Sequence, residues 1–143
     1  MFSYNLLSKT SFNINSGLID AIFSEINDIV PKSQLGTLNI ILMSDEEIKK
    51  LNSDYRGINK VTDVLSFHYY DDFKNLRDEE IAGEIVMNEK LIYLQGEEFQ
   101  HGAEKEFYKL LIHSVLHILG YDHETDSDYK VMKDLEDKIW KII

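Results

Sequence analysis

Apolar residues recur at helical spacing in five stretches of the chain. In residues 16–30 the stripe contains Leu18, Ile22 and Ile26, and Pro31 closes it because proline cannot continue a helix. The same spacing predicts four further helices: from Ser44 to about Asp54, from Asn88 to Gln100, from Glu104 to Leu119 and from Ser127 to Ile142. Five amphipathic helices of this length indicate a chain that folds around a shared core.

Two of these helices carry further signals. Ser44 stands three residues before Glu47, which is the spacing of a capping box at a helix start. In the helix at 104–119 one side is expected to be buried, through Phe107, Leu110, Leu111, Ser114, Val115 and Ile118. In the last helix the residues spaced for packing are Val131, Leu135, Ile139 and Ile142.

Shorter apolar runs have the composition of β-strands. The ranges are Phe2–Leu7 as an edge strand, Leu38–Met43 as a buried strand, Asp63–Tyr70 and Gly83–Met87. The charged segment Asp71–Ile81 has no clear period, which predicts an exposed loop between strands. Helices and strands alternate irregularly and no linker interrupts them. We therefore expect one domain over residues 1–143, of α+β class, with a small mixed sheet of about four strands covered by helices.

Composition narrows the class of protein. Hydrophobic residues make up 43% of the 143 residues, there is no cysteine, and the formal net charge is −11. The absence of cysteine excludes thiolate metal sites, and together with the lack of a signal peptide it favours a cytoplasmic protein. No apolar run approaches the length of a membrane span. A chain this acidic repels nucleic acid at long range. Any site that binds phosphate must therefore be local and built from few cations.

Three of the five histidines fall close together, in the stretch HSVLHILGYDH, as His113, His117 and His123. The first two are four residues apart, so they project from one face of a helix. Gly120 is placed to end that helix in the left-handed conformation, which lets the chain return with His123. Three imidazoles with an open fourth position are typical of a catalytic zinc site, although nickel, copper or iron would also suit these ligands.

The spacing of the histidines and the glycine is that of the metzincin proteases, H-E-x-x-H-x-x-G-x-x-H. The general-base glutamate of those enzymes would follow the first histidine directly, and here that residue is Ser114. A serine cannot accept a proton from water as a carboxylate does. Either another residue is the base or the metal alone lowers the pKa of its bound water to about 7.

A second cluster of polar residues lies in the stretch NSDYRGINKVTDVLSF, residues 52–67. Each member has an ordinary explanation, since Gly57 can end a helix and Arg56 is a cation in its last turn. The functional interpretation is that Arg56 and Lys60 contact a phosphate group. The arginine fork matches the oxygens of a phosphate better than a lysine does.

Taken together, the two clusters resemble the YbeY family of bacterial endoribonucleases, also called rRNA maturation factors. The resemblance runs from about Asn52 to the C-terminus. The matching segments are Tyr55-Arg56-Gly57, Thr62-Asp63-Val64-Leu65-Ser66-Phe67, Gly83-Glu84-Ile85 and His113 through His123. Two positions depart from the family pattern: His68 stands where the family has proline, and Ser114 where it has glycine. We expect His68 and His101 to be surface or structural histidines, and the Ser114 hydroxyl to be able to bond back along its helix.

The resemblance implies a zinc-dependent endoribonuclease, specific for single-stranded RNA, that acts in 16S rRNA maturation and ribosome quality control. Its partners would be precursor rRNA and the assembling small ribosomal subunit, with no role at a membrane or on DNA. His113, His117 and His123 would hold the metal and Arg56 would stabilise charge on the phosphodiester.

Weaker candidates complete the expected site. Lys60 is a further phosphate contact, Asp122 could orient an imidazole or merely form a turn, and Glu84 could be a base or a strand-end residue. Two other functions stay open from the residues alone. One is a metzincin-like peptidase or another zinc hydrolase, and the other is a non-catalytic ribosome assembly factor whose metal pins the C-terminal helix.

Overall fold

A four-stranded mixed sheet forms the centre of the computed structural model, which describes residues 1–143. The strands are β1 (Ser3–Leu6), β2 (Thr37–Met43), β3 (Val64–His68) and β4 (Ile81–Asn88), in the spatial order β1-β2-β4-β3. β1 is parallel to β2 and β2 to β4, whereas β3 runs antiparallel to β4 at the other edge. β3 therefore leaves one side of its backbone unpaired within the sheet.

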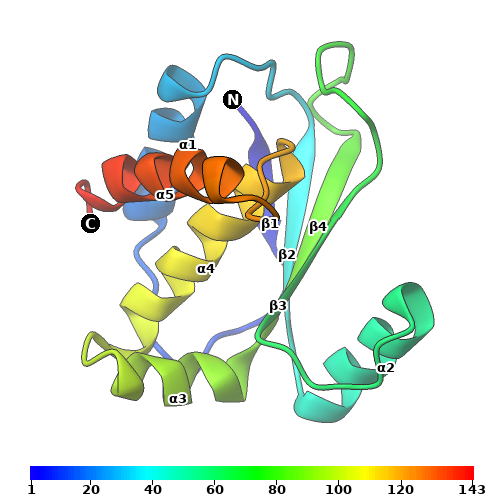
Figure 1. Cartoon of the computed structure of the whole chain (residues 1–143), viewed down its shortest axis with the longest axis vertical. Helices are drawn as coiled ribbons and strands as arrows, with labels where there is room; N and C mark the ends of the chain where they lie inside the picture. Colours follow the sequence, from blue (N-terminus) through cyan, green and yellow to red (C-terminus); the bar gives the residue numbers. More distant parts are fainter.

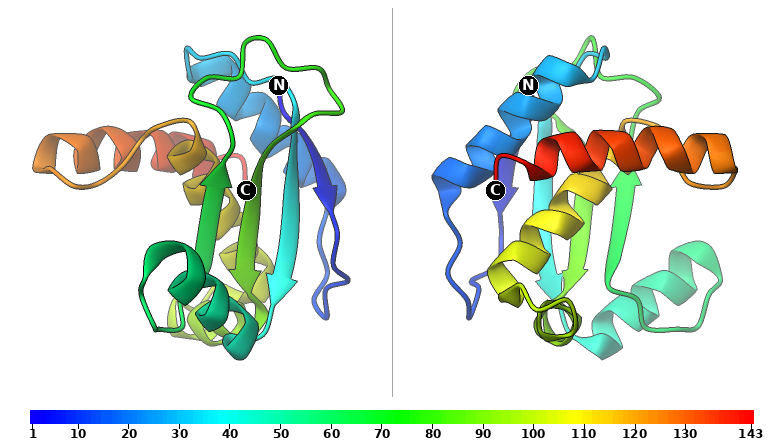
Figure 2. Two further views of the ribbon diagram at one scale, coloured as in Figure 1. Left: turned by 90° about the vertical axis from the view of Figure 1, so that its right-hand side faces the viewer. Right: turned by 60° about the vertical axis from the view of Figure 1, so that its left-hand side comes forward.

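Five helices surround this sheet: α1 (Ser16–Ile29), α2 (Asp45–Arg56), α3 (Glu89–Glu98), α4 (Gly102–Ile118) and α5 (Asp126–Trp140). Four of them, α1, α3, α4 and α5, lie on one face, which we call the inner face; α5 crosses over α4 (Figure 1). Only α2 lies against the other, outer face, at one end of the sheet (Figure 2, left). None of these helices combines the length and the apolarity that crossing a bilayer requires.

The alternation of side chains along the strands separates two hydrophobic clusters. On β4, Ile85 and Met87 point to the inner face and join the main core, which includes Phe107, Leu111 and 20 further buried residues. Val86 points the other way and packs with Ile48 of α2 in a small outer cluster. The predicted α+β class, with a small mixed sheet covered by helices, is confirmed by this arrangement.

The start of α2 and the buried side of α4 also follow the sequence pattern. Ser44 caps α2, and the reciprocal contacts with Glu47 form the predicted capping box. All six residues expected on the buried side of α4 are buried.

The packing face of α5 differs from the prediction. Val131 is exposed, while its neighbour Met132 is buried and Ile139 lies in the core. The face is set by where α5 crosses α4 and α1, which the spacing of apolar residues alone does not reveal. Exposure of one valine costs little free energy, so the sequence pattern is compatible with either rotation of α5 about its axis.

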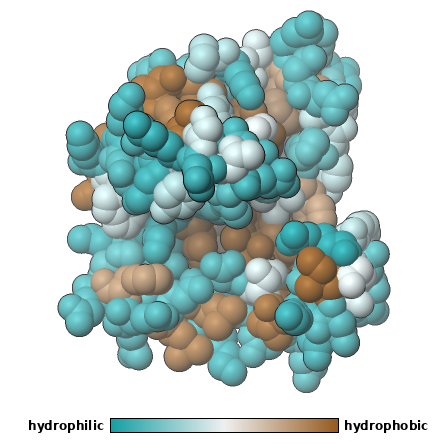
Figure 3. Space-filling model, in the orientation of Figure 1, coloured by the Kyte–Doolittle hydropathy of each residue, from teal (hydrophilic) through white to brown (hydrophobic).

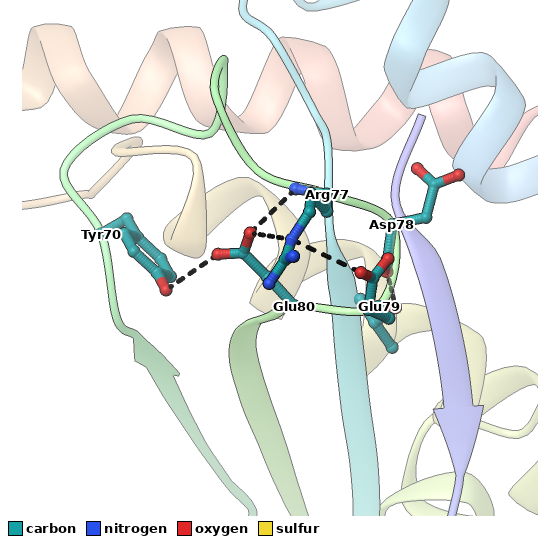
Figure 4. A network of polar contacts seen from close by, with 6 residues as sticks. Tyr70, Arg77, Asp78, Glu79 and Glu80 are labelled. Carbon is teal, nitrogen blue, oxygen red and sulfur yellow. Dashed lines mark hydrogen bonds and ion pairs between the residues drawn. The ribbon is translucent and has the colours of Figure 1, made fainter.

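The loop between β3 and β4 is tethered at two points, although the sequence suggested an exposed segment. Phe73 is buried against Phe2, with their ring centres 5.2 Å apart. Arg77 forms ion pairs with Glu79 and Glu80, and the Tyr70 hydroxyl faces Glu80 (Figure 4). Hydrogen bonds from the Arg77 backbone and guanidinium hold the pKa of Glu80 below its usual range. One of the two arginines of the chain is thereby engaged inside the loop.

Gly83 marks a close approach between β4 and β3. A Cβ atom at this position would overlap the carbonyl oxygen of Phe67 on the neighbouring strand, so only glycine lets the two strands pair here. We predict that Gly83→Ala lowers the free energy of unfolding by about 1–3 kcal/mol, because β3 must shift to relieve the overlap. Urea denaturation of the variant and the native protein measures this difference. Equal midpoints for the two proteins would contradict the prediction.

Candidate active site

α4 ends in the reversal that the sequence predicted. Gly120 has a φ of +100°, the left-handed conformation that glycine adopts without strain. The Tyr121 N–H donates to the Leu116 carbonyl at 3.1 Å and the Gly120 N–H to the His117 carbonyl at 3.0 Å, so the last carbonyls of the helix are satisfied. The chain then turns back over the end of α4 and carries His123 toward the helical histidines.

The three histidines of the motif lie side by side at this helix end. The ring centres of His113 and His117 are 6.2 Å apart, and those of His113 and His123 are 5.8 Å apart. Imidazoles that share one ion at a metal–nitrogen distance of about 2.1 Å have ring centres roughly 5 Å apart. The structure contains no group of three or more His, Asp or Glu side chains already at metal-ligand geometry. Side-chain rotations that move the rings by about 1 Å would bring them to that spacing.

The outer ring nitrogens of the two helical histidines have partners that orient the rings. The Nδ1–H of His117 donates to the Tyr121 carbonyl at 2.9 Å, because a carbonyl can only accept. Nδ1 of His113 faces a carboxylate oxygen of Glu136, on α5, at 3.6 Å. In each ring Nε2 is left to bind a ligand. A carbonyl or carboxylate behind each imidazole is the usual support of a metal-bound histidine, so the donor set fits a divalent transition metal.

Glu136 belongs to the site although sequence reasoning gave it no role there. It reaches His113 only because α5 crosses α4, and the two positions are 23 residues apart in the chain. Glu136 lies four residues after the buried Met132 and so shares its face of α5. This spacing predicts a contact with His113 only when the point at which α5 crosses α4 is known. Asp122, the candidate for this supporting role, accepts a hydrogen bond from the Glu124 N–H at 3.2 Å, which is a turn contact.

A cleft of about 420 Å³ joins the histidines to the second cluster of the sequence. It is lined by His113, His117 and His123, by Arg56, and by residues of β3. Arg56 and His113, which are 57 positions apart in the chain, therefore line one cavity. The surface is mainly hydrophilic, but apolar residues show in the hollow between α5 and α3 (Figure 3), where Val64 and Leu110 line an adjoining cavity.

Arg56 is held at the cleft by the end of its helix. Gly57 ends α2 with a φ of +67°, and buried Asn52 donates to the Lys60 carbonyl at 3.0 Å, which fixes the loop that follows. The Arg56 guanidinium is exposed and has neither an ion pair nor a hydrogen bond in the structure. Arg77 is engaged in its own loop, so Arg56 is the one arginine with its donors free (Figure 4).

The remaining candidates lie outside the cleft or face elsewhere. Lys60 is exposed beyond Gly57 and does not line the cleft. Glu84 points to the outer face of the sheet, where the Tyr69 hydroxyl donates to it. His68 ends β3, with Nδ1 at 3.1 Å from the Tyr70 carbonyl, and His101 pairs with Glu106 at 2.8 Å. These two histidines are surface and structural residues, as expected.

Comparison with known proteins defines the class to which this site and fold belong. The sequence matches the family described as endoribonuclease YbeY over residues 7–143. Endoribonuclease YbeY of Caldicellulosiruptor bescii is 40% identical over 111 residues, covering 71% of this chain and 70% of that protein. The YbeY protein of Thermosipho melanesiensis is 38% identical over 118 residues, covering 80% of each chain.

A solved structure agrees with the sequence relatives. The solution structure of TM1509 from Thermotoga maritima superposes with a TM-score of 0.60 at 28% identity, covering 99% of this chain and 90% of that one. The chain belongs to the YbeY family of endoribonucleases, which confirms the resemblance found in its motifs.

Ser114, where the family pattern has glycine, lies beneath the metal-binding face of α4. Its side chain is 0% exposed and its hydroxyl has no hydrogen-bond partner, so the bond back to the preceding turn is not formed. We predict that Ser114→Ala raises the free energy of unfolding by about 1 kcal/mol, because it removes an unpaired buried hydroxyl. Ser24→Ala on α1, an exposed helical position, measures the change in helix propensity alone. An equal gain in both variants would contradict the cost assigned to the hydroxyl.

Proposed function

We propose that this protein is a zinc-dependent endoribonuclease that cuts single-stranded RNA, and that it acts in maturation of the 16S rRNA and in ribosome quality control. The observation that supports the proposal is that Arg56, whose guanidinium is unpaired, lines the same cleft as the three imidazoles. Cleavage of RNA is also the activity named for the relatives. The finer points, zinc and the ribosomal substrate, rest on the resemblance and on the chemistry of the donor set.

His113, His117 and His123 would hold the metal through their free Nε2 atoms. A bound divalent cation polarises a phosphoryl oxygen and lowers the pKa of a bound water to about 7. Tyr121 and Glu136 keep the two helical rings turned toward the cleft. In the neutral ring, a proton on Nδ1 that is donated to a carbonyl leaves the lone pair of Nε2 available to a metal.

Arg56 supplies the positive charge that the substrate phosphate needs. A guanidinium can donate two parallel hydrogen bonds to a phosphodiester, and it holds its charge at any physiological pH. Because it has no protein partner, no ion pair must break before it binds the substrate. Its position opposite the imidazoles lets it stabilise the extra negative charge that develops as the phosphodiester is attacked.

The charge of the chain constrains how RNA is recognised. At a net charge of −11, the protein as a whole repels a polyanion, and only Arg56 offers a free guanidinium at the cleft. Affinity for free RNA should therefore be modest, and it should depend only weakly on salt because so few phosphates are neutralised. Recognition within an assembling small ribosomal subunit would supply the missing contacts, and we expect no role on DNA or at a membrane.

The peptidase alternative has no structural support at its key position. The residue after His113 would have to be a carboxylate that reaches the cleft, and Ser114 is instead enclosed in the core. His68 lies away from the three histidines, so it offers no fourth ligand that would seal the site. An open position favours a catalytic metal over a purely structural one.

We predict that Arg56→Ala slows cleavage of a single-stranded oligoribonucleotide by roughly 100-fold or more, since one charge-stabilising group is removed. Its fold and its zinc content should be unchanged because the side chain is exposed and unpaired. Arg77→Ala is the matched control, with the same loss of charge at a distance from the cleft. Equal cleavage by the Arg56 and Arg77 variants would remove Arg56 from the mechanism.

We predict that Glu136→Gln weakens zinc binding by about 10-fold or more, because the carboxylate behind His113 both orients the ring and strengthens it as a ligand. Competition with a chelator measures the Kd. His117→Ala should lose most of the single equivalent of zinc expected for the native protein, while Asp137→Asn, at the adjacent position on α5, should retain it. A Kd for Glu136→Gln equal to that of Asp137→Asn would sink this role for Glu136.

A further inference from the structure

A second cavity, of about 450 Å³, opens on the outer face of the sheet just beyond α2. This face is covered by α2 only at one end, so the cavity lies where the cover stops (Figure 2, left). Its lining is mostly apolar, and neither a lysine nor an arginine takes part in it. His68 is the one basic side chain in the lining, and its Nδ1 is engaged with the Tyr70 carbonyl, so the cavity suits a group with an apolar surface better than a phosphate.

Aromatic rings form one wall of this cavity. Tyr55, on the last turn of α2, is 71% exposed and meets Phe67 edge to face with ring centres 5.7 Å apart. Tyr69 completes the set and is also exposed. No other part of the chain covers these rings. Exposed aromatic side chains beside a nucleic-acid site are the common platform on which single-stranded bases stack.

The cavity adjoins the active-site cleft. Ser66 and Phe67 of β3 line both, and the neighbouring residues Tyr55 and Arg56 each face one of the two. A nucleotide strand that places a phosphate at Arg56 therefore has its neighbouring base at the mouth of the aromatic cavity. The edge of β3 forms the boundary between the phosphate and the base.

A carboxylate lies within the cavity. Glu84 accepts a hydrogen bond from the Tyr69 hydroxyl through Oε1, which leaves Oε2 free. Partial burial of the Tyr69 hydroxyl, together with its bond to Glu84, raises the pKa of Tyr69 to about 12, so the phenol remains a donor at neutral pH. The free carboxylate oxygen can accept from an amino group, as a glutamate does from the amino group of cytosine.

We propose that this cavity is a base subsite of the enzyme. One nucleobase of the RNA strand, next to the phosphodiester at Arg56, stacks on Tyr55, and Glu84 favours a base that presents an amino group over uracil. The inference rests on the proposed function and adds to it a preference for base identity. A base suits the cavity better than a peptide segment does, because the cavity is continuous with the phosphate site and its exposed wall is aromatic.

Binding of a non-cleavable 2′-O-methyl oligoribonucleotide, followed by fluorescence anisotropy, tests the stacking. Tyr55→Ala should weaken binding by roughly 10-fold, and Tyr55→Phe should restore it because the ring is kept. Tyr129→Ala, at an exposed tyrosine of α5, is the matched control and should bind as the native protein does. Native affinity in Tyr55→Ala would overturn the proposal and leave the cavity to a protein segment.

A series of oligonucleotides that each lack one base separates a base contact from a general effect on the protein. At one position, removal of the base should weaken oligonucleotide binding by the native protein. The same removal should leave binding by Tyr55→Ala unchanged. At that position cytosine should bind better than uracil, and Glu84→Gln should reduce this difference. A Tyr55 effect that persists whichever base is absent would overturn the base subsite. If Tyr55→Ala binds the oligonucleotide as tightly as the native protein, and the native protein cleaves RNA, only the base subsite is wrong. If the native protein does not cleave RNA, the proposed function is wrong.

Discussion

Burial of one side of α4 against the inner face of the sheet is the interaction on which the site depends. Phe107, Leu111 and Val115 are fully enclosed, so the helix cannot rotate without exposing them. His113 is consequently fixed at the edge of the buried stripe, where it is half-buried, and His117 lies one turn further on, where it is exposed. The reversal at Gly120 adds His123 to them. Ordinary core packing and one left-handed residue thus bring together the three histidines that we propose as metal ligands.

The crossing of α5 over α4 links this packing to the chemistry of the rings. Met132 and Ile139 anchor α5 in the core, and this places Glu136 behind His113. Tyr121 performs the equivalent task for His117 through its carbonyl. The imidazoles are therefore oriented by groups that the fold already holds in place. The rings then need only side-chain rotations, rather than a change of the backbone, to converge on one ion as proposed.

The chain has few cations near the cleft, so the position of the edge strand β3 between the cleft and the aromatic cavity matters for the proposed binding of RNA. Arg77 is paired within its loop, so Arg56 is the arginine that we propose as the phosphate contact in the cleft. β3 separates this cleft from the aromatic cavity on the outer face, and Gly83 allows the strand to lie close enough to β4 for that. At a net charge of −11 the chain has no broad basic surface, so the proposed binding of RNA relies on one cation, a metal and stacking.

The sequence by itself determined the helices, the strands, the capping box at Ser44 and the left-handed Gly120, because these depend on residues close together in the chain. It also placed the three histidines on one helix end, since i and i+4 positions share a face. Only the tertiary structure decided that Arg56 faces the histidines while Lys60 and Glu84 do not, and that Glu136 supports His113. For the same reason the packing face of α5 was predicted only in part, at Leu135 and Ile139 but not at Val131. Those relations depend on how elements cross and on which side of a sheet a residue points, and these follow from the burial of the whole core rather than from local spacing.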